Sequence, residues 1–576
     1  MSPPLEEALS RMGREITSPE WDFSLPGRFR SKVQLDLDVF EKLLSGTDFA
    51  AETPMTGVEL ELDLIDANGQ AVFDNLAVID ATEGIDVVPE LARFNVEVNA
   101  EPRLLDGDAL HRLRAELRAS MGEVNRAAAT IGASVLPIGL LPTLTTEELA
   151  GEWMTESSRF QALNDAIIRA RGEDVVLDIT GPSHERLHMG WPTVAPEGAC
   201  TSFQLHTQVT PRDFARAWNS AQAIAGAQVA IGANSPYFFG TEIWQEGRVP
   251  VFTQAVDTRP AELVNQGVNP RVHFGDNWIT SIFDLLEANV RYFPPLLPEM
   301  SDEDPEAVLA AGGVPQLEEL MLHNGTIYRW NRPIYDTAGG VPQLEELMLH
   351  NGTIYRWNRP IYDTAGGVPH LRVENRVLPA GPTAADMVAN AAFFFGATRF
   401  FSRQTRPIWS KLSFTAAETN FLRGARDGFD AQMFWPGIGR VTPDQLVLDV
   451  LLPVAEAGLR GLGADQDAID LYLGVIEGRC LSRTNGAVWQ VQAVKAFESR
   501  GQSRAEALRS MTLQYQANAR TGEPVHTWDI PHSGGVLPPM DSLADQGAEM
   551  PSSGGSSRRR EGPVVAHAVP GPVKPE

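Results

Sequence analysis

The sequence predicts an α+β fold, in which strands from distant parts of the chain pair in a sheet and helices cover one side of it. Several short segments alternate strictly between apolar and polar residues, which is the period of a half-buried strand. Segments with helical spacing lie between these strands and dominate from Ala384 to about Ala519. Strands scattered among helices in this way are typical of an α+β domain.

The chain begins with a predicted leader, a helix and a strand. The first thirty residues have the character of a loosely attached leader, and Gln34 to Leu44 has helical spacing, so residues 1–45 are interpreted as leader and helix. Val58 to Leu64 alternates strictly, and the turn residues 67–69 (Ala-Asn-Gly) follow it. This combination predicts a strand that enters a hairpin.

The later elements are predicted by the same two periods. They are a second alternating strand within residues 95–101, a helix in 107–133, a short buried strand in 135–143, a third alternating strand in 199–211, a helix in 212–233, and a fourth alternating strand in 370–377.

An exact internal duplication interrupts the chain. Residues 312–338 are repeated letter for letter as residues 339–365. Solenoid repeats of similar period keep their core positions while other positions diverge. These copies are identical at every position, so one copy is interpreted as an insertion in an ordinary globular fold.

Composition limits the classes of function. A net charge of -28 at pH 7 disfavours nucleic-acid binding, because a polyanion repels phosphates, and leaves small molecules as the expected partners. Cys200 and Cys480 are too few for a disulfide framework or a zinc cluster, as expected in a reducing cytosol. The sequence has no secretory signal and no run approaching ~20 apolar residues. We therefore expect a cytoplasmic protein without a membrane partner.

Each alternating strand carries polar side chains on one face, because residues two apart in a strand point to the same side. For any single strand, an antiparallel sheet with one face in water explains the pattern. The four polar faces contain Glu59, Glu61 and Asp63; Asn95, Glu97, Asn99 and Glu101; Ser202, Gln204, His206 and Gln208; and His370, Arg372, Glu374 and Arg376.

Four of the glutamates on these faces would repel one another if they came together. Glutamate is a poor strand former, and like charges placed opposite each other destabilise a sheet. If Glu59, Glu61, Glu97 and Glu374 converge, they require a cation among them. Carboxylates with an occasional imidazole or amide oxygen suit a hard divalent ion, Mg²⁺ above all.

Two arginines flank the glutamate of the last strand. Arg372 and Arg376 share the face of Glu374, and guanidinium groups beside carboxylate-bound magnesium suit a polyphosphate. Simple ion pairing with the glutamates is the alternative explanation. The sequence contains no Gly-rich phosphate loop of the Walker or dinucleotide kind, so a nucleotide would be held by the metal and the sheet.

These segments resemble the glutamate-cysteine ligase family, in the branch called carboxylate-amine ligases within the glutamine-synthetase-like superfamily. The resemblance covers about Thr56 to Arg376, with weaker helical similarity to about Ala519. Its most specific parts are GVELEL, PEL with another glutamate seven residues after its own, SFQLHTQV, RWNRP, and RVENR running into LPAGPT.

The resemblance implies an ATP-dependent ligase built on a curved antiparallel sheet with helices packed on its outer face. In this family the γ-carboxylate of glutamate attacks ATP, and an amine, commonly that of cysteine, displaces phosphate from the acyl phosphate. Two or three magnesium ions bridge the nucleotide and the carboxylates. We therefore expect synthesis of γ-glutamylcysteine, a step of glutathione biosynthesis, with residues 46–532 as the catalytic domain and residues 533–576 as a disordered tail.

The family motifs match individual residues of this chain. Glu59 and Glu61 match paired metal ligands, Glu90 and Glu97 match a second acidic pair, and Glu374 matches the acid of the late strand. The resemblance implies Glu59, Glu61, Glu90, Glu97, His206 and Glu374 as metal ligands, Arg359, Arg372 and Arg376 as catalytic residues, and Gln204, Arg356 and Arg376 as nucleotide-binding residues.

One position departs from the common family pattern. Many members have histidine at the first of two inward positions on the third strand, where this chain has Gln204, and His206 occupies the second. Because glutamine also offers a carbonyl oxygen, the sequence leaves open which of the two contacts a metal. An ordinary hydrogen-bonded histidine is the alternative for His206.

The duplication gives two candidates for the RWNRP strand. Thr353 to Asp363 leads directly through a turn into His370, whereas Thr326 to Asp336 must close across another copy, at a cost on the order of 1 kcal/mol. We therefore assign the site to the downstream copy. This prediction places Arg356 and Arg359 in the site, and Arg329 and Arg332 in a displaced insertion.

Several alternatives stay open at this point. One sequence does not identify the residues that select the amine, so a ligase for another amine is one alternative, and a catalytically inactive nucleotide- or metal-binding homologue is the other. The segment Arg483 to Gln490 is interpreted equally well as a substrate loop or as a helix-capping turn. A homo-oligomer is compatible with the sequence.

Overall fold

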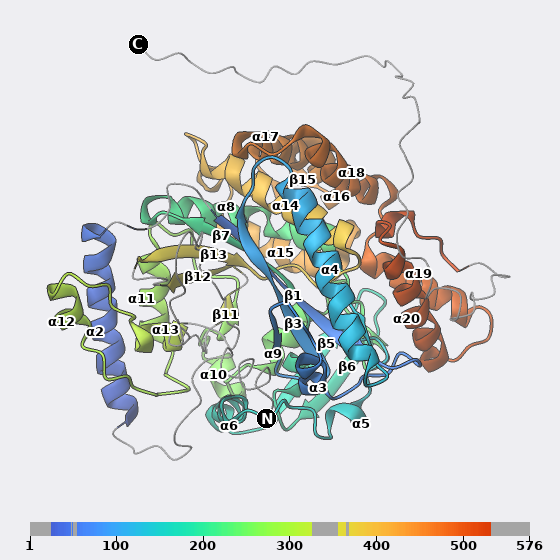
Figure 1. The fold of residues 1–576 in the computed structure, drawn as a ribbon, viewed down its shortest axis with the longest axis horizontal. Coiled ribbons are helices and arrows are strands. Elements are labelled where there is room, and N and C mark those ends of the chain that lie inside the picture. The colour runs from blue at the N-terminus through green and yellow to red at the C-terminus, as the bar shows by residue number, and fades with distance from the viewer. Residues whose placement is uncertain are drawn as a thin grey trace, which may run out of the picture. The chain divides into compact units, whose positions relative to one another are not determined.

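A seven-stranded antiparallel sheet lies at the centre of the fold (Figure 1). The computed structural model describes residues 25–47, 49, 55–324, 355–356, 358–363 and 368–531. The strand order is β12 (Asn358–Asp363), β13 (His370–Asn375), β7 (Phe203–Val209), β1 (Met55–Ile65), β3 (Asn95–Leu104) and β2 (Val87–Pro89), and β4 (Ser134–Leu136) pairs with the end of β1.

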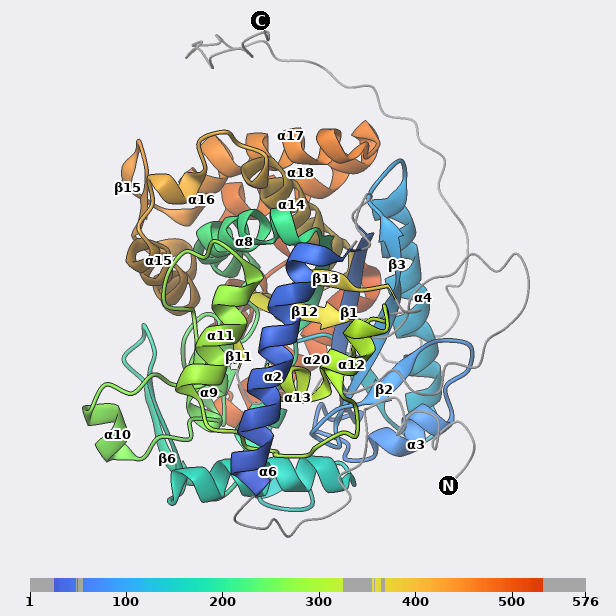
Figure 2. The same ribbon diagram turned by 90° about the vertical axis from the view of Figure 1, so that its left-hand side faces the viewer.

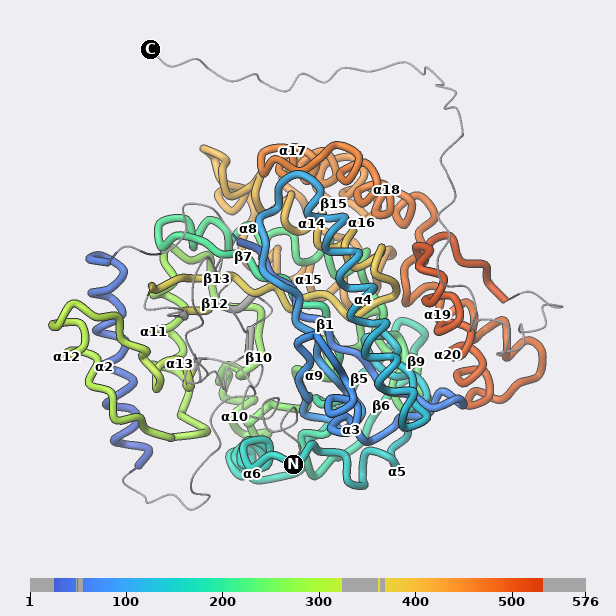
Figure 3. Tube along the Cα trace, in the orientation of Figure 1, coloured from blue at the N-terminus to red at the C-terminus, as the bar shows by residue number. Residues whose placement is uncertain are grey.

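All four alternating segments form strands of this one sheet, although they are far apart in the sequence. The Cα trace in Figure 3 shows that the chain returns after long excursions to place β7 beside β1 and β13 beside β7. In Figures 1 and 2, β1 and β3 run at a steep angle to β12 and β13, so the sheet is strongly twisted. The predicted α+β class, with a curved antiparallel sheet and helices on its outer face, is confirmed.

Three long helices form a layer on the apolar face of the sheet. α4 (Ala109–Ala129) contacts β3, α8 (Pro211–Gly232) contacts β7 and β13, and α14 (Ala384–Ser402) contacts β7, α4 and α8. Val58 and Leu60 of β1 are buried on this side. Outside this layer, α17 (Leu452–Leu462) and α18 (Gln466–Ser482) pack on α14.

A second group of helices packs beside β12 (Figure 2). It contains α2 (Leu25–Gly46), α11 (Ile282–Tyr292), α12 (Pro305–Ala310) and α13 (Glu318–Asn324). The ring centroids of Phe40 on α2 and Tyr362 on β12 are 5.2 Å apart.

The predicted leader is therefore shorter than thirty residues. The helix already begins at Leu25, and Phe29 is fully buried within the core. The apolar spacing of Gln34 to Leu44 continues back through Val33 and Phe29, which the prediction left out of the helix. The predicted boundary was therefore too late. Residues 1–24 lie outside the described part of the chain.

The predicted hairpin after β1 is present only as a turn and one antiparallel bridge. The Asp66 carboxylate accepts hydrogen bonds from the backbone N–H groups of Asn68 (2.7 Å) and Gln70 (2.9 Å). The returning segment makes a single bridge from Ile65 to Ala71. The chain then enters α3 (Asn75–Asp80) instead of a strand, so β1 obtains its long neighbours, β3 and β7, from later segments.

The segment Arg483 to Gln490 is a helix-capping turn. Asn485 is the N-cap of α19 (Gly486–Glu498), and its side-chain oxygen accepts a hydrogen bond from the backbone N–H of Val488 at 3.0 Å. α19 in turn packs against α20 (Arg504–Thr521). No helix in the described parts of the chain is both long and apolar enough to span a bilayer.

The described elements of the duplicated region come from both copies. α13 comes from the upstream copy, whereas β11 (Tyr355–Arg356) and β12 come from the downstream copy. β12 pairs with β13 as the sequence predicts, and β11 pairs in parallel with β10 (Val272–His273). Arg329 and Arg332 lie outside the described residues, as does the predicted tail 533–576.

Asp36 of α2 is a buried acid whose titration affects the stability of this helical group. The backbone N–H of Leu320 donates to its Oδ2 at 2.9 Å. Burial, and then the nearby Glu319, raise the pKa of Asp36 to about 8. Because this pKa lies above that of the unfolded chain, the folded state binds more protons between the two values, and stability falls as pH rises through this window.

We predict that Asp36→Asn removes part of this fall, because asparagine keeps an oxygen acceptor for Leu320 but does not ionise. Thermal unfolding followed by circular dichroism at about pH 5 and about pH 8 should give a smaller difference in Tm for the variant than for the wild type. Asp38→Asn, at an exposed position of the same helix, should leave the difference unchanged. An equal pH dependence in Asp36→Asn and the wild type would contradict the prediction.

Candidate functional site

The sheet register brings the predicted polar residues onto one face. Glu59 of β1 lies opposite Gln204 of β7, and Glu61 of β1 lies opposite Glu97 of β3. Residues that face each other across an antiparallel pair point to the same side. On the far side of β7 this polar face continues through His206, Glu374 of β13 and Arg359 of β12, which are register partners in that order.

Three glutamates of this face form a compact group, which we call the acidic cluster. One carboxylate oxygen from each of Glu61, Glu90 and Glu97 lies within 4.8 Å of the others. Glu90 directly follows the short strand β2, whose pairing with β3 sets its position beside Glu97. All three side chains are at most 2% exposed.

Glu61 is held in a fixed orientation by neighbouring donors. The backbone N–H of Ser202 donates to its Oε2 at 2.6 Å, and the Ser202 hydroxyl donates to its Oε1 at 2.8 Å. Nε2 of Gln204 also donates to Oε1, at 2.7 Å. Gln204 therefore positions a cluster carboxylate, and its own carbonyl oxygen accepts no hydrogen bond from a described residue.

The other carboxylates of the cluster lack such donors. Among the described residues, no N–H or hydroxyl group donates to either oxygen of Glu97 or to Oε1 of Glu90. Burial raises the pKa of Glu90 well above its ordinary value, and Glu61 and Glu97 raise it further. Burial, and then Glu59 and Glu61, likewise raise the pKa of Glu97.

This donor set fits a hard divalent cation. Buried carboxylates with raised pKa values and unpaired oxygens are groups that a cation would stabilise in the ionised form. Oxygen-only ligands at this spacing suit Mg²⁺ or a similar ion. The cluster can therefore hold a metal through Glu61, Glu90 and Glu97.

Two pairs of side chains lie beside the cluster, and each pair joins a basic group to a glutamate. Nε2 of His206 lies 3.0 Å from Oε1 of Glu59, and Nη1 of Arg376 donates to Oε1 of Glu374 at 2.6 Å. Arg376 is 1% exposed. Burial raises the pKa of Glu61, and the positive charge of Arg376 opposes this rise. Arg376 is thus both paired with Glu374 and close enough to act on the cluster.

The remaining predicted arginines are placed by the sheet. Arg372 is buried and lies opposite Gln208 of β7, on the same face as Glu374. For Arg356 and Arg359 the structure describes the backbone: Arg359 is the register partner of Glu374, and Arg356 lies in β11, which pairs outside the main sheet. The roles assigned to these arginines stay predictions.

Sequence reasoning missed two charged residues of the site. Glu197 lies in the short helix α7 (Ala195–Gly198). This helix is held against the polar face, since the Asn95 side chain of β3 donates a hydrogen bond to the Gly198 carbonyl at 3.0 Å. Burial, and then Glu61, raise the pKa of Glu197 to about 8.

Arg248 is the second missed residue and begins α9 (Arg248–Ala255). Its Nε donates to Glu246 Oε1 at 2.7 Å, and its Nη2 donates to the Val377 carbonyl at 3.0 Å. Its positive charge also opposes the rise in the pKa of Glu61, which is mainly due to burial. Neither Glu197 nor Arg248 lies in an alternating strand, so the period-two pattern carried no signal for them.

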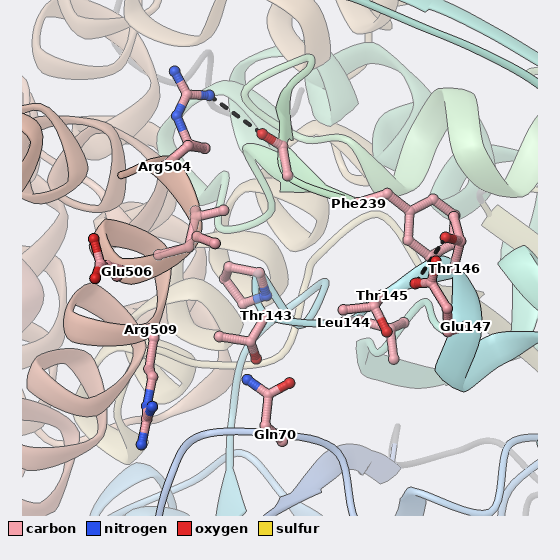
Figure 4. A pocket seen from close by; sticks show the side chains of 14 residues that line it. Gln70, Thr143, Leu144, Thr145, Thr146, Glu147, Phe239, Arg504, Glu506 and Arg509 are labelled. Atoms are coloured by element: carbon pink, nitrogen blue, oxygen red, sulfur yellow. Dashed lines mark hydrogen bonds between the residues drawn. The ribbon is translucent and has the colours of Figure 1, made fainter. Parts of the chain in front are cut away.

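A separate pocket contains none of these residues (Figure 4). It has a volume of about 620 Å³ and is lined by the turn after β1, residues 142–147, Phe239 and the first turns of α20. Arg504 donates to the Gly240 carbonyl at its rim and is ion-paired with Glu185 and Glu498. The acidic cluster, and not this pocket, brings the predicted carboxylates together and is therefore the candidate site.

Comparison with known proteins identifies a family. The model of the family described as glutamate-cysteine ligase family 2 matches residues 55–514 of the chain. No curated protein matches the sequence.

Solved structures that match the fold have low sequence identity. A glutamate-cysteine ligase from Francisella tularensis in complex with AMP is 11% identical, with a TM-score of 0.46, over 84% of this chain and 91% of that chain. A bifunctional glutathione synthetase from Pasteurella multocida is 12% identical, with a TM-score of 0.40, over 85% and 55%. The complex of the ubiquitin-like protein Pup with its ligase PafA is 9% identical, with a TM-score of 0.33, over 80% and 73%.

The acidic cluster predicts an effect of charge removal on stability. In the absence of divalent cations, Glu97→Gln should raise Tm, because it removes one of three buried, mutually repelling carboxylates. Adding Mg²⁺ should raise the Tm of the wild type more than that of the variant, because the variant has lost one ligand of the cluster. Differential scanning fluorimetry measures both effects.

Glu101→Gln is the matched control, because Glu101 lies on the same strand but is exposed. It should behave as the wild type with and without Mg²⁺. An equal Mg²⁺-dependent rise in Tm in Glu97→Gln and the wild type would show that the cluster is not the cation site.

Proposed function

The chain belongs to glutamate-cysteine ligase family 2, and we propose that it is an ATP-dependent ligase that joins the γ-carboxylate of L-glutamate to the amine of L-cysteine. Membership in this family supports the reaction class of an ATP-dependent carboxylate-amine ligase. The observation that carries the proposal is the convergence of Glu61, Glu90 and Glu97 on one buried face. An acidic cluster of this kind suits magnesium-assisted phosphoryl transfer.

The polar face offers ligands for two or three magnesium ions. Glu61, Glu90 and Glu97 would hold one ion, and Glu59 and Glu374 lie on the same face for others. Of the amide and imidazole groups, Gln204 has an unpaired carbonyl oxygen, whereas His206 lies against Glu59. Bound magnesium would neutralise the negative charge of the ATP phosphates beside the carboxylates.

The arginines of the face supply fixed positive charge. Arg376 is oriented by its ion pair with Glu374 and is buried, so it would contact phosphoryl oxygens without first reorganising in water. Arg372 and Arg359 are assigned the same task from neighbouring positions of β13 and β12. Phosphoryl transfer needs mainly positioning and charge stabilisation, so this reaction does not require a covalent nucleophile of the protein.

The proposed reaction has two steps. A γ-carboxylate oxygen of glutamate attacks the γ-phosphorus of ATP, and ADP leaves to give an acyl phosphate. The amine nitrogen then attacks the acyl carbon, loses a proton, and phosphate leaves with the former carboxylate oxygen. Burial of the polar face keeps water away from the acyl phosphate, which water would otherwise hydrolyse.

The amine is tested by a screen of amino acids for glutamate-dependent ADP formation. The proposal predicts that ADP forms only when glutamate and an amine are both present, and fastest with cysteine. Faster turnover with another amine would overturn cysteine but keep the ligase reaction. ADP formation with neither substrate would indicate a simple ATPase, and no ADP formation at all would indicate an inactive homologue.

A cytoplasmic location and a role in glutathione biosynthesis belong to the same proposal. Both cysteines of the chain, Cys200 and Cys480, are buried free thiols. Free thiols are typical of reducing compartments, where cysteine is also available as a substrate.

Arg376→Lys should lower kcat by roughly 100-fold, because a single ammonium group cannot reproduce the planar guanidinium fork at the phosphate. The KM for cysteine should change little. Arg460→Lys is the control, because Arg460 is exposed on α17 and pairs with Glu456. A variant that retains wild-type kcat with the same far-UV spectrum would remove Arg376 from the proposed machinery.

Substitutions in the two copies test which one serves the site. Arg359→Ala should reduce turnover, whereas Arg332→Ala should not, because the strand that pairs with β13 comes from the downstream copy. Because the two copies are identical, deletion of either one yields the same protein, which still contains one complete copy. This deletion should keep or improve activity. Loss of activity only in Arg332→Ala would reverse the assignment.

A further inference from the structure

A small pocket lies on the opposite side of the sheet from the acidic cluster. It has a volume of about 110 Å³ and is lined by the ends of β1 and β7, the start of α8 and the last turns of α14. Thr207 of β7 lines it, whereas the preceding residue His206 points to the polar face. The sheet therefore separates this pocket from the proposed ligase site.

The charges that line this pocket do not balance. Arg399 and Arg403 lie one turn apart on α14, and Asp213 is the carboxylate among the lining residues. Nη2 of Arg403 is 3.4 Å from Oδ2 of Asp213. The guanidinium of Arg399 has no hydrogen bond or ion pair with a residue that the structure describes. Two guanidinium groups against one carboxylate leave a net positive charge.

Hydrogen-bond donors surround the same space. Thr398 is 4% exposed, lines the pocket, and its hydroxyl has no hydrogen-bond partner among the described residues. α8 begins here with Thr210 as its N-cap. Pro211 has no N–H and the Asp213 N–H is bonded to the Thr210 hydroxyl, so this N-terminus contributes mainly the partial positive charge of the helix dipole. The Thr398 hydroxyl, this partial charge and the surplus guanidinium all favour an anion.

Helix stabilisation alone does not account for the two arginines. Basic side chains near the C-terminus of a helix interact favourably with its dipole and its last carbonyls. At the end of α14, however, the Ser402 carbonyl already accepts a hydrogen bond from Arg216 at 3.2 Å. Burial, and then Arg403, lower the pKa of Arg399. Placing the two guanidinium groups of Arg399 and Arg403 beside each other is therefore unfavourable.

We propose that this pocket binds one small oxyanion of the phosphate class, held by the guanidinium fork of Arg399 and the N-terminus of α8. A guanidinium donates two parallel hydrogen bonds to a phosphate or sulfate. The pocket is smaller than the ~300 Å³ at which sites for larger organic ligands begin, which excludes a whole nucleotide. The bound anion would connect α8, α14 and β7, the strand that carries Gln204 and His206 on its other face.

Isothermal titration calorimetry with inorganic phosphate at constant ionic strength tests the proposal on the full chain. The wild type should show saturable binding, and sulfate should compete for it whereas chloride should not. Arg399→Gln should weaken binding by roughly tenfold or more, because a charge-assisted pair is lost. Arg399→Lys should fall in between, because it keeps the charge without the fork.

Two controls separate this pocket from other phosphate sites. Arg460→Gln removes an exposed arginine of α17 and should bind phosphate as the wild type does. Glu97→Gln alters the acidic cluster and should also leave this binding unchanged, which distinguishes it from phosphate bound as a reaction product. Should Arg399→Gln fail to fold, Thr398→Val provides the test and should weaken binding, because it removes the buried hydroxyl. Wild-type affinity in Arg399→Gln, or no saturable binding in the wild type, overturns the proposal.

Discussion

Repulsion among buried carboxylates is the constraint on which the structure of this protein depends. Glu61, Glu90 and Glu97 are brought within 4.8 Å of one another by the pairing of β1, β2 and β3. Burying like charges is unfavourable unless a cation joins them or they take up protons, as their raised pKa values indicate. Such a cluster lowers the stability of the fold, and this cost is the physical basis for proposing that it binds a cation.

The sheet separates the tasks of stability and chemistry by the alternation of its strands. In β1, Val58 and Leu60 pack against the helical layer, while Glu59 and Glu61 face the site. The same helices that cover the apolar face thus fix the positions of the carboxylates through the backbone of one strand. A one-residue slip of β1 would exchange the two faces, so the register is strongly determined.

The sequence predicted the part of the site that follows a periodic rule. Alternation assigned Glu59, Glu61, Glu97 and Glu374 to the polar faces of their own strands, and the register places these faces on one side of the sheet. Glu197 and Arg248 were not predictable in this way, since tertiary packing of short helices brings them to the polar face. The hairpin predicted after β1 ends at a single bridge for a related reason. The local turn at Asp66 indicates that the chain reverses, but not which segment pairs with β1.

The most direct measurement is the position of a bound ion. Crystals grown with Mn²⁺ in place of Mg²⁺ would show the metal by its anomalous scattering. The account predicts a peak within about 2.5 Å of oxygens from Glu61, Glu90 and Glu97. An ion bound elsewhere while this cluster stays empty, or a cluster whose three carboxylates bind no ion at saturating Mn²⁺, would contradict it.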